Sequence, residues 1–228
     1  MGSPDLLLAL LADARLPVGG HTQSAGVEPA MAHGGLTAAD VPAFTTGRLR
    51  TVTAVEAGTA VVARHRVLAG DDLAPLQRAW AARTPSQPLR AASGTLGRGY
   101  LRLARSLWPD PPHLEGGWDG LERTCGRTPP RPLVLGALAA VAGLDAERLV
   151  RLCAHEDVAT AAAAVLKLEP LDPLVATGWV LAAHPEVEAL VERCAHLTDP
   201  DDVPATAAPL VEQFSLQHAV TRQRLFHA

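Results

Sequence analysis

Helix-type apolar patterns follow one another along almost the whole chain, and this succession constrains the fold more than any other feature of the sequence. Apolar residues recur at three- and four-residue spacing within each segment, and proline- or glycine-rich breaks separate the segments. No segment shows a convincing apolar–polar alternation of the kind that marks a half-buried strand. We therefore predict an all-α fold, a single-domain helical bundle of about ten helices that spans residues 1–228.

Residues with known preferences for helix ends place the boundaries. Ser3 followed by Pro4 is typical of a helix start, and Thr37 with Asp40 resembles a capping box. Gly70 is a typical helix stop. The expected helices cover about residues 4–16, 24–34, 40–68, 72–83, 89–108, 133–143, 145–168, 174–183, 186–196 and 209–220, with one more short helix possible within 113–130.

Composition and charge exclude several classes of function. The formal net charge is −4 and the arginines are scattered, so no basic stripe for nucleic acid is present. No Walker-type loop is present, so the chain itself is not expected to bind GTP. Three cysteines far apart fit a reducing compartment. The longest uncharged runs are shorter than the roughly 18–20 residues of a membrane span. The N-terminus does not resemble a signal peptide, so we expect a soluble, cytoplasmic protein without membrane contact.

The loop Leu16–Glu28, with the sequence LPVGGHTQSAGVE, lies between two predicted helices. It contains one proline, one serine and three glycines, which are Pro17, Ser24, Gly19, Gly20 and Gly26. This composition predicts a shaped loop rather than a flexible linker.

Catalytic and metal-binding patterns are weak. His155 and Glu156 begin like a zinc-protease helix, but Ala159 occupies the position of the second histidine. His21, within the loop, is a candidate metal ligand, and a histidine bound only to water is the equal alternative. Ser24 and His21 could form a nucleophile and base, but no nucleophile elbow surrounds Ser24 and no strand precedes it. Helix capping is therefore the favoured role of Ser24, and we expect no catalytic residues.

Four separated segments resemble the urease accessory protein family UreF, in the family's order. They are the loop Leu16–Glu28; Leu89 and Arg90 with Gly97; the segment Val165–Pro170; and Pro209, His218 and Arg224-Leu225-Phe226 near the C-terminus. Four such segments, at fitting separations and spanning nearly the whole chain, are hard to produce by chance.

The chain also departs from the family's pattern. The replaced segments are His21-Thr22-Gln23 for a tripeptide that contains an aromatic residue, Ser86-Gln87-Pro88 for Thr-Arg-Glu, Asp172-Pro173 for Gly-Gln, and His227-Ala228 for a terminal Arg-Ser. The core spacing is retained, so these departures bear on partner affinity rather than on the fold.

The resemblance implies a function that the residues alone do not reveal. UreF proteins are all-α, tend to form homodimers and are not enzymes. They bind the accessory protein UreD (also called UreH) and the GTPase UreG, and the assembly delivers nickel to the urease apoprotein. A regulatory effect on the GTPase step has been proposed for them. The resemblance thus implies a cytoplasmic adaptor with no stably bound cofactor, nickel being handled by the complex.

Partner-binding residues follow from the same resemblance. The C-terminal tail, about residues 221–228, is expected to dock on partners through Arg224, Leu225 and Phe226, together with His218, and a frayed terminus is the alternative. The second group consists of Pro17, Gly19, Gly20, Ser24, Gly26 and Glu28. Glu28 could equally serve as a charge that favours a helix N-terminus.

Two other functions stay open on the residues alone. One is a helical regulatory protein, unrelated to urease, that binds a small ligand between its helices. The other is a helical hydrolase that uses Ser24 and His21.

Overall fold

Twelve α-helices and three short 3-10 helices form the part of the chain that the computed structural model describes, residues 3–226, in which there is no strand. The α-helices are α1 (Pro4–Leu11), α2 (Val27–Gly34), α3 (Val41–Arg50), α4 (Val52–Ala69), α5 (Ala74–Arg83), α6 (Gln87–Leu107), α7 (Gly117–Cys125), α8 (Arg131–Ala142), α9 (Ala146–Leu168), α10 (Pro173–Ala182), α11 (His184–Cys194) and α12 (Pro209–Val220). The 3-10 helices are η1 (Gly20–Thr22), η2 (Ala38–Asp40) and η3 (Pro200–Asp202). The all-α prediction is confirmed.

Several helix starts lie where the capping residues predict them, whereas the predicted end of the first helix is wrong, because α1 stops at Leu11 and not at residue 16. The Ser3 hydroxyl accepts the backbone N–H of Asp5 at 3.3 Å, and Thr37 and Asp40 form the predicted capping box. Asp145 accepts the N–H of Arg148 at 2.8 Å at the start of α9. Capping residues in the local sequence are therefore sufficient to predict these helix starts.

The predicted helix over residues 40–68 is wrong in one respect, because it is two helices. It breaks at Thr51, whose backbone has φ −122° and ψ −95° and lies outside the helical region. The Thr51 carbonyl oxygen accepts the hydroxyl of Thr206 at 3.0 Å, a contact with a segment far along the chain. No local pattern encodes such a partner, so the break could not be seen in the sequence.

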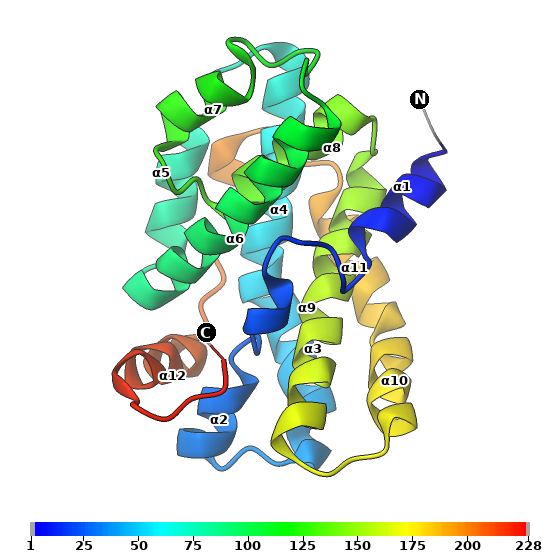
Figure 1. The fold of residues 1–228 in the computed structure, drawn as a ribbon, viewed down its shortest axis with the longest axis vertical. Helices are drawn as coiled ribbons and strands as arrows, with labels where there is room; N and C mark the ends of the chain where they lie inside the picture. The colour runs from blue at the N-terminus through cyan, green and yellow to red at the C-terminus, as the bar shows by residue number, and fades with distance from the viewer. Residues whose placement is uncertain (1–2, 227–228) are drawn as a thin grey trace.

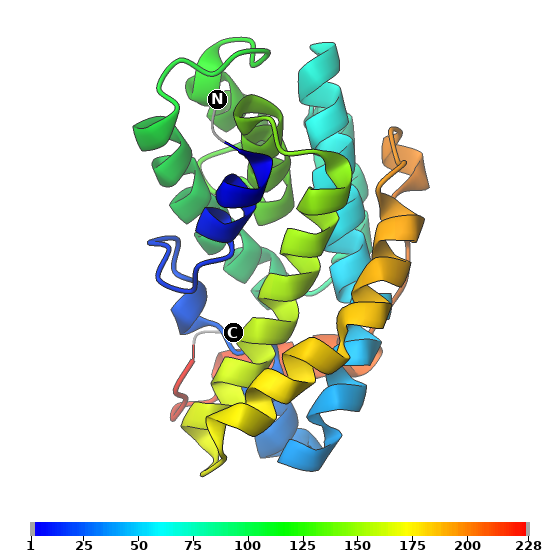
Figure 2. The same cartoon turned by 90° about the vertical axis from the view of Figure 1, so that its right-hand side faces the viewer.

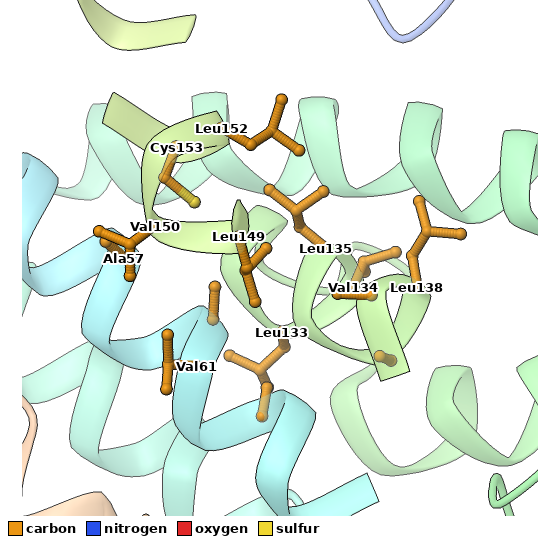
Figure 3. Packing of buried hydrophobic residues seen from close by; sticks show 14 of the residues in the cluster. Ala57, Val61, Leu133, Val134, Leu135, Leu138, Leu149, Val150, Leu152 and Cys153 are labelled. Atoms are coloured by element: carbon orange, nitrogen blue, oxygen red, sulfur yellow. The ribbon is translucent and has the colours of Figure 1, made fainter. Parts of the chain in front are cut away.

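The core is built around α4, α8 and α9, which pass through the middle of the molecule (Figure 1). Leucine side chains of α8 and α9, including Leu133, Leu135 and Leu149, are fully buried, and Figure 3 shows them between α4 and the neighbouring helices. Gly136 lets α8 approach α4 closely, since a Cβ built there would lie 2.2 Å from the carbonyl oxygen of Ala60. The centre of the bundle therefore depends on a residue without a side chain.

Other helices cover this centre on several sides. Helices α5, α6 and α7 pack together on one side of it, and α10 and α11 lie along α9 on another (Figures 1 and 2). Helix α12 packs against α2 and α6, at the end of the molecule where α2 lies. Phe214 of α12 rests on Gly34 of α2, where a Cβ would come within 2.4 Å of its ring. This contact fixes the position of the last helix, from which the C-terminal tail emerges.

Residues Pro173–Cys194, which form α10 and α11, are the one stretch of the described chain that is long and apolar enough to cross a membrane, by length and composition alone. Its second half carries the charged residues Glu186, Glu188 and Glu192. That half also packs Leu190 into the core against α9. The structure divides this stretch into two helices, with α11 beginning at His184.

The three cysteines give a test of the packing, since all are free and buried. Burial raises the pKa of the Cys125 and Cys153 thiols to about 12 and that of Cys194 to about 11. Because the thiolate is the reacting form, we expect the folded protein to resist an aromatic disulfide reagent at pH 8. The same reagent should titrate three thiols in urea. Rapid reaction of any thiol in the folded protein would show that the helices around it are not packed as described.

Candidate partner-binding site

The loop between α1 and α2 has the defined shape that its composition predicts. Gly19 and Gly26 have φ values of +90° and +78°, which favour glycine, whereas Gly20 does not occupy this left-handed region. The Thr22 hydroxyl donates to the Gly19 carbonyl oxygen at 2.8 Å and closes the turn. Two of the three predicted glycines are thus required by backbone conformation.

The first half of the loop is seated on α6. A Cβ on Gly99 would lie 2.4 Å from the carbonyl oxygen of Val18, so α6 carries a glycine where the loop crosses it. Arg102, one turn further along α6, donates to the Pro17 carbonyl oxygen at 3.1 Å. Small residues of α6 thus allow a close approach to this helix, and at Gly99 the approaching segment is the loop itself.

The second half of the loop begins α2. Ser24 is fully buried, and its hydroxyl oxygen accepts the first-turn N–H of Glu28 at 3.4 Å. The N-cap position itself is occupied by Gly26, so Ser24 contacts the first turn from two residues before the cap, and its prediction as the capping residue is wrong in position. Pro29 lies in the first turn of α2, where a missing backbone donor is tolerated.

Glu28 joins the loop to the C-terminal tail across 197 residues of sequence. One of its carboxylate oxygens accepts the backbone N–H of Leu225 at 2.6 Å, and the other accepts that of Phe226 at 2.9 Å. The tail therefore returns from the end of α12 toward the start of α2, as the red segment in Figure 1 shows. A charge-assisted pair of bonds to one carboxylate is stronger than two neutral bonds.

Phe226 is the apolar end of this connection. Its side chain is buried in a second hydrophobic cluster, with Val27, Val41 and Val165 among its buried members. The Lys167 ammonium group lies 5.1 Å from the centre of the ring, a cation–π arrangement. Within its own chain the tail is thus packed up to Phe226, and it is not frayed. His227 and Ala228 lie outside the described residues.

His218 of α12 is buried and contacts both Glu28 and the tail. Its Nε2 atom lies 3.2 Å from the carbonyl oxygen of Phe226 and 3.4 Å from the Glu28 carboxylate. Both neighbours are acceptors, so the proton of the neutral ring resides on Nε2. Arg224 remains exposed and donates to the His218 carbonyl oxygen at 3.3 Å. Leu225 is also exposed.

The predicted site residues therefore fall into two groups. Pro17 contacts α6 through Arg102, whereas Glu28 contacts His218, Leu225 and Phe226 directly. A pocket of about 400 Å³ borders both groups, with Gly20, His21 and Gly26 on its loop side and Phe226 at its tail side. The loop and the tail are thus parts of one surface, although their assignment to partner binding stays a prediction.

One departure from the family's pattern has a structural role in this surface. Ser86, in the replaced segment before α6, is buried and caps α6 by accepting the N–H of Leu89 at 3.4 Å. Its hydroxyl also lies 2.7 Å from that of Ser215 on α12. The replacement thus ties the helix that carries the tail to α6.

Sequence reasoning missed a cluster of charged residues deep in the same pocket. Arg131, at the start of α8, forms ion pairs with Glu56 of α4 and Glu156 of α9, and the Tyr100 hydroxyl donates to Glu156. Trp80 donates its indole N–H to Glu56 at 2.9 Å. Glu156 was noticed only as part of a failed zinc motif. The signal that could have pointed to the cluster is Arg131 itself, the one ionisable residue of the apolar helix α8.

Burial dominates the electrostatics of this cluster. Desolvation raises the pKa of the Glu56 carboxyl, although Arg131 and the Trp80 N–H act in the opposite direction. Burial, followed by the charge of Glu156, raises the pKa of Tyr100. Desolvation disfavours the charged form of Arg131, but Glu156 outweighs it with its neighbours, so the pKa of Arg131 is raised. The guanidinium therefore stays charged and binds the surrounding helices together.

Metal-binding groups do not converge in the part of the chain that the structure describes. Among residues 3–226, no three His, Cys, Asp or Glu side chains are placed to hold a metal ion. His21 is exposed, and its carbonyl oxygen lies 3.5 Å from the Lys167 ammonium group. Its candidacy as a ligand stays a prediction.

Fold and site together define a helical protein whose distinctive residues form a surface of one loop and one tail. The chain belongs to the UreF family of urease accessory proteins, because the UreF family model matches residues 36–184. The urease accessory protein UreF of Mycobacterium marinum (strain ATCC BAA-535 / M) is 35% identical over 226 residues, covering 96% of this chain and 97% of that protein. The proteins of the same name from Mycobacterium sp. (strain JLS) and Mycobacterium tuberculosis (strain ATCC 25618 / H37Rv) are each 34% identical, and each match covers 96% of this chain. The resemblance seen in the sequence is confirmed.

Proposed function

We propose that this chain is a non-enzymatic adaptor of urease maturation that acts in the cytoplasm during nickel insertion into the urease apoprotein. Its partners are UreD (also called UreH), the GTPase UreG and the urease apoprotein, and it regulates the GTPase step. It acts as a homodimer and holds no cofactor of its own, because nickel is the cargo of the whole assembly. Membership of the UreF family supports this role, and it argues against the alternative function of a regulatory protein unrelated to urease.

One observation carries the proposed site: Glu28 in the loop holds the backbone of Leu225 and Phe226 in the tail. The two segments predicted to bind partners are therefore one surface, to which Leu225 and Arg224 contribute exposed groups. Arginine is one of the residue types that are enriched in the binding hot spots of protein interfaces, which supports Arg224 as a contact residue. A chain without a catalytic set can still act through such a surface, by stabilising one conformation of a partner.

The hydrolase alternative has no comparable support. Ser24 is fully buried and accepts the N–H of Glu28, whereas His21 is exposed. Replacing Ser24 with alanine tests it directly, since a hydrolase that uses this serine would lose its activity.

Removing residues 224–228 is expected to abolish co-purification with UreD and UreG from the same source. The deletion takes away Arg224, Leu225 and Phe226, the residues assigned to docking. The measurement is the amount of each partner that a tagged chain retains after affinity purification. Arg222→Ala is the matched control, since Arg222 is exposed in the same tail and should leave retention unchanged.

Circular dichroism must show that the shortened chain still folds, because Phe226 is a buried residue. The point variants Arg224→Ala and Leu225→Ala remove exposed groups only, so they keep the test valid if the deletion unfolds the chain. Full retention of both partners by the folded shortened chain would refute the site.

A further inference from the structure

Helix α6 is strongly basic, although the whole chain has a formal net charge of −4. It contains four arginines and no acidic residue. Arg98, Arg102 and Arg105 follow one another at spacings of four and three residues, so they share one face of the helix. Arg98 and Arg102 are exposed on this face.

Two loops that pack on α6 border this basic face. The loop between α1 and α2 lies against Gly99, as described above. The loop between α7 and α8 places the backbone of Thr128 against Gly94, one turn before Arg98. Arg127, the residue before Thr128, is exposed. The fold therefore adds a guanidinium group from a distant part of the sequence, and we call Arg98, Arg102 and Arg127 the basic patch.

The arginines of the basic patch have no carboxylate partner within residues 3–226. Arg102 donates only to the carbonyl oxygen of Pro17. Arg105, by contrast, pairs with Asp119 and Glu122 of α7, each at 2.6 Å. Exposed like charges that gather on one face raise the local potential, which attracts a surface of opposite charge.

We propose that the basic patch docks an acidic surface of a protein partner in the urease maturation assembly. This inference rests on the proposed function, because it names a second contact surface of the same adaptor, apart from the C-terminal tail. Charge complementarity determines the chemistry of the partner. A guanidinium group binds a carboxylate through two parallel N–H···O bonds, whereas a basic partner surface would be repelled.

Nucleic acid fits the basic patch less well than a protein does. Asp119 and Glu122 lie beside Arg105 at one end of the basic face, and the Asp119 side chain is 76% exposed. A phosphate backbone that continued past the patch would meet these carboxylates and a chain of net negative charge. A protein surface can present a few carboxylates to the arginines and neutral groups beyond them.

The first measurement is the affinity of the full chain for UreD, UreG and the urease apoprotein, each purified from the same source. Arg98→Glu and Arg127→Glu each reverse a charge that makes no hydrogen bond or ion pair within the described chain, so the fold should be unchanged by circular dichroism. We expect both variants to weaken binding of the same partner by about tenfold at low salt, mainly through slower association. The difference from the wild type should shrink as salt is added.

The matched control is Arg78→Glu, which makes the same change of net charge at an exposed arginine of α5. It should leave the affinity for that partner unchanged. A loss in Arg78→Glu equal to the loss in Arg98→Glu would show that overall charge, and not the basic patch, sets the affinity.

The second measurement tests the chemistry of the occupant. Arg98→Lys keeps the positive charge and supplies a primary amine, which a zero-length carbodiimide joins to a carboxylate in direct contact. We expect mass spectrometry of the complex to find an amide bond between this amine and an Asp or Glu side chain of the partner. Arg78→Lys should give no such cross-link.

The outcomes separate this inference from the proposed function. Unchanged affinity for all three partners in Arg98→Glu and Arg127→Glu overturns the docking role of the basic patch and leaves the proposed function intact. Tight binding of a single-stranded oligonucleotide at physiological salt, lost in Arg98→Glu, would assign the patch to nucleic acid and also overturn the inference. Failure of the wild-type chain to bind any of the three partners would end both.

Discussion

Replacing Arg131 with methionine is expected to lower the free energy of unfolding by about 3 kcal/mol, because it leaves two mostly buried carboxylates without their partner. The Arg131 side chain is 13% exposed and pairs with Glu56 and Glu156, which are 22% and 21% exposed. Methionine preserves most of the apolar stem, so the loss measures the charge rather than the volume. The measurement is the midpoint and slope of a urea unfolding curve.

Two further variants test the reason for that loss. Arg98→Met removes an exposed arginine on α6 and should change the free energy of unfolding by less than about 0.5 kcal/mol. Adding Glu156→Gln to Arg131→Met should restore part of the stability, since it removes one of the unpaired charges. Equal destabilisation by Arg131→Met and Arg98→Met would contradict the cluster as described.

Gly136→Ala is expected to destabilise the protein by about 1–3 kcal/mol or more, through overpacking where α8 crosses α4. The added Cβ would lie 2.2 Å from the Ala60 carbonyl oxygen and 2.6 Å from the Ala63 Cβ, and neither atom can move without shifting α4. Thermal unfolding followed by circular dichroism would show a lower midpoint.

Gly178→Ala is the matched control within another helix. A Cβ there meets nothing within 4 Å, so the substitution should stabilise α10 by about 0.5–1 kcal/mol through reduced backbone entropy. A loss at Gly178 as large as that at Gly136 would show that helix propensity, and not the helix crossing, sets the effect.

Most of the fold was predictable because its signals are local. Caps such as Asp145 and stops such as Gly70 act within one turn of the residue that carries them. The break at Thr51 was not predictable from local signals, and the hydroxyl that its carbonyl oxygen accepts, from Thr206, lies far along the chain. The residues of the site were predictable as two separate segments through the family resemblance. Their connection through Glu28 was not, because a carboxylate can satisfy backbone donors anywhere in the chain.

The charged cluster was not predictable either, because its residues come from helices far apart in the sequence. Arg131 stands at the start of the apolar helix α8, whereas Glu156 lies within α9 between His155 and Asp157. Sequence spacing cannot show that they face each other across the bundle. Only the close crossings of α4, α8 and α9 bring Glu56 to the same arginine.

The inward course of the last residues bears on how this protein should be handled at the bench. Phe226, two residues before the end of the sequence, lies in a packed cluster. A purification handle or fluorescent label fused at this end would be attached close to that buried side chain, where it can disturb the packing. Attachment ahead of Ser3, beside the solvent-facing Leu6 of the first helix, avoids this conflict. A protein labelled at the C-terminal end would report on a chain whose tail packing the label had changed.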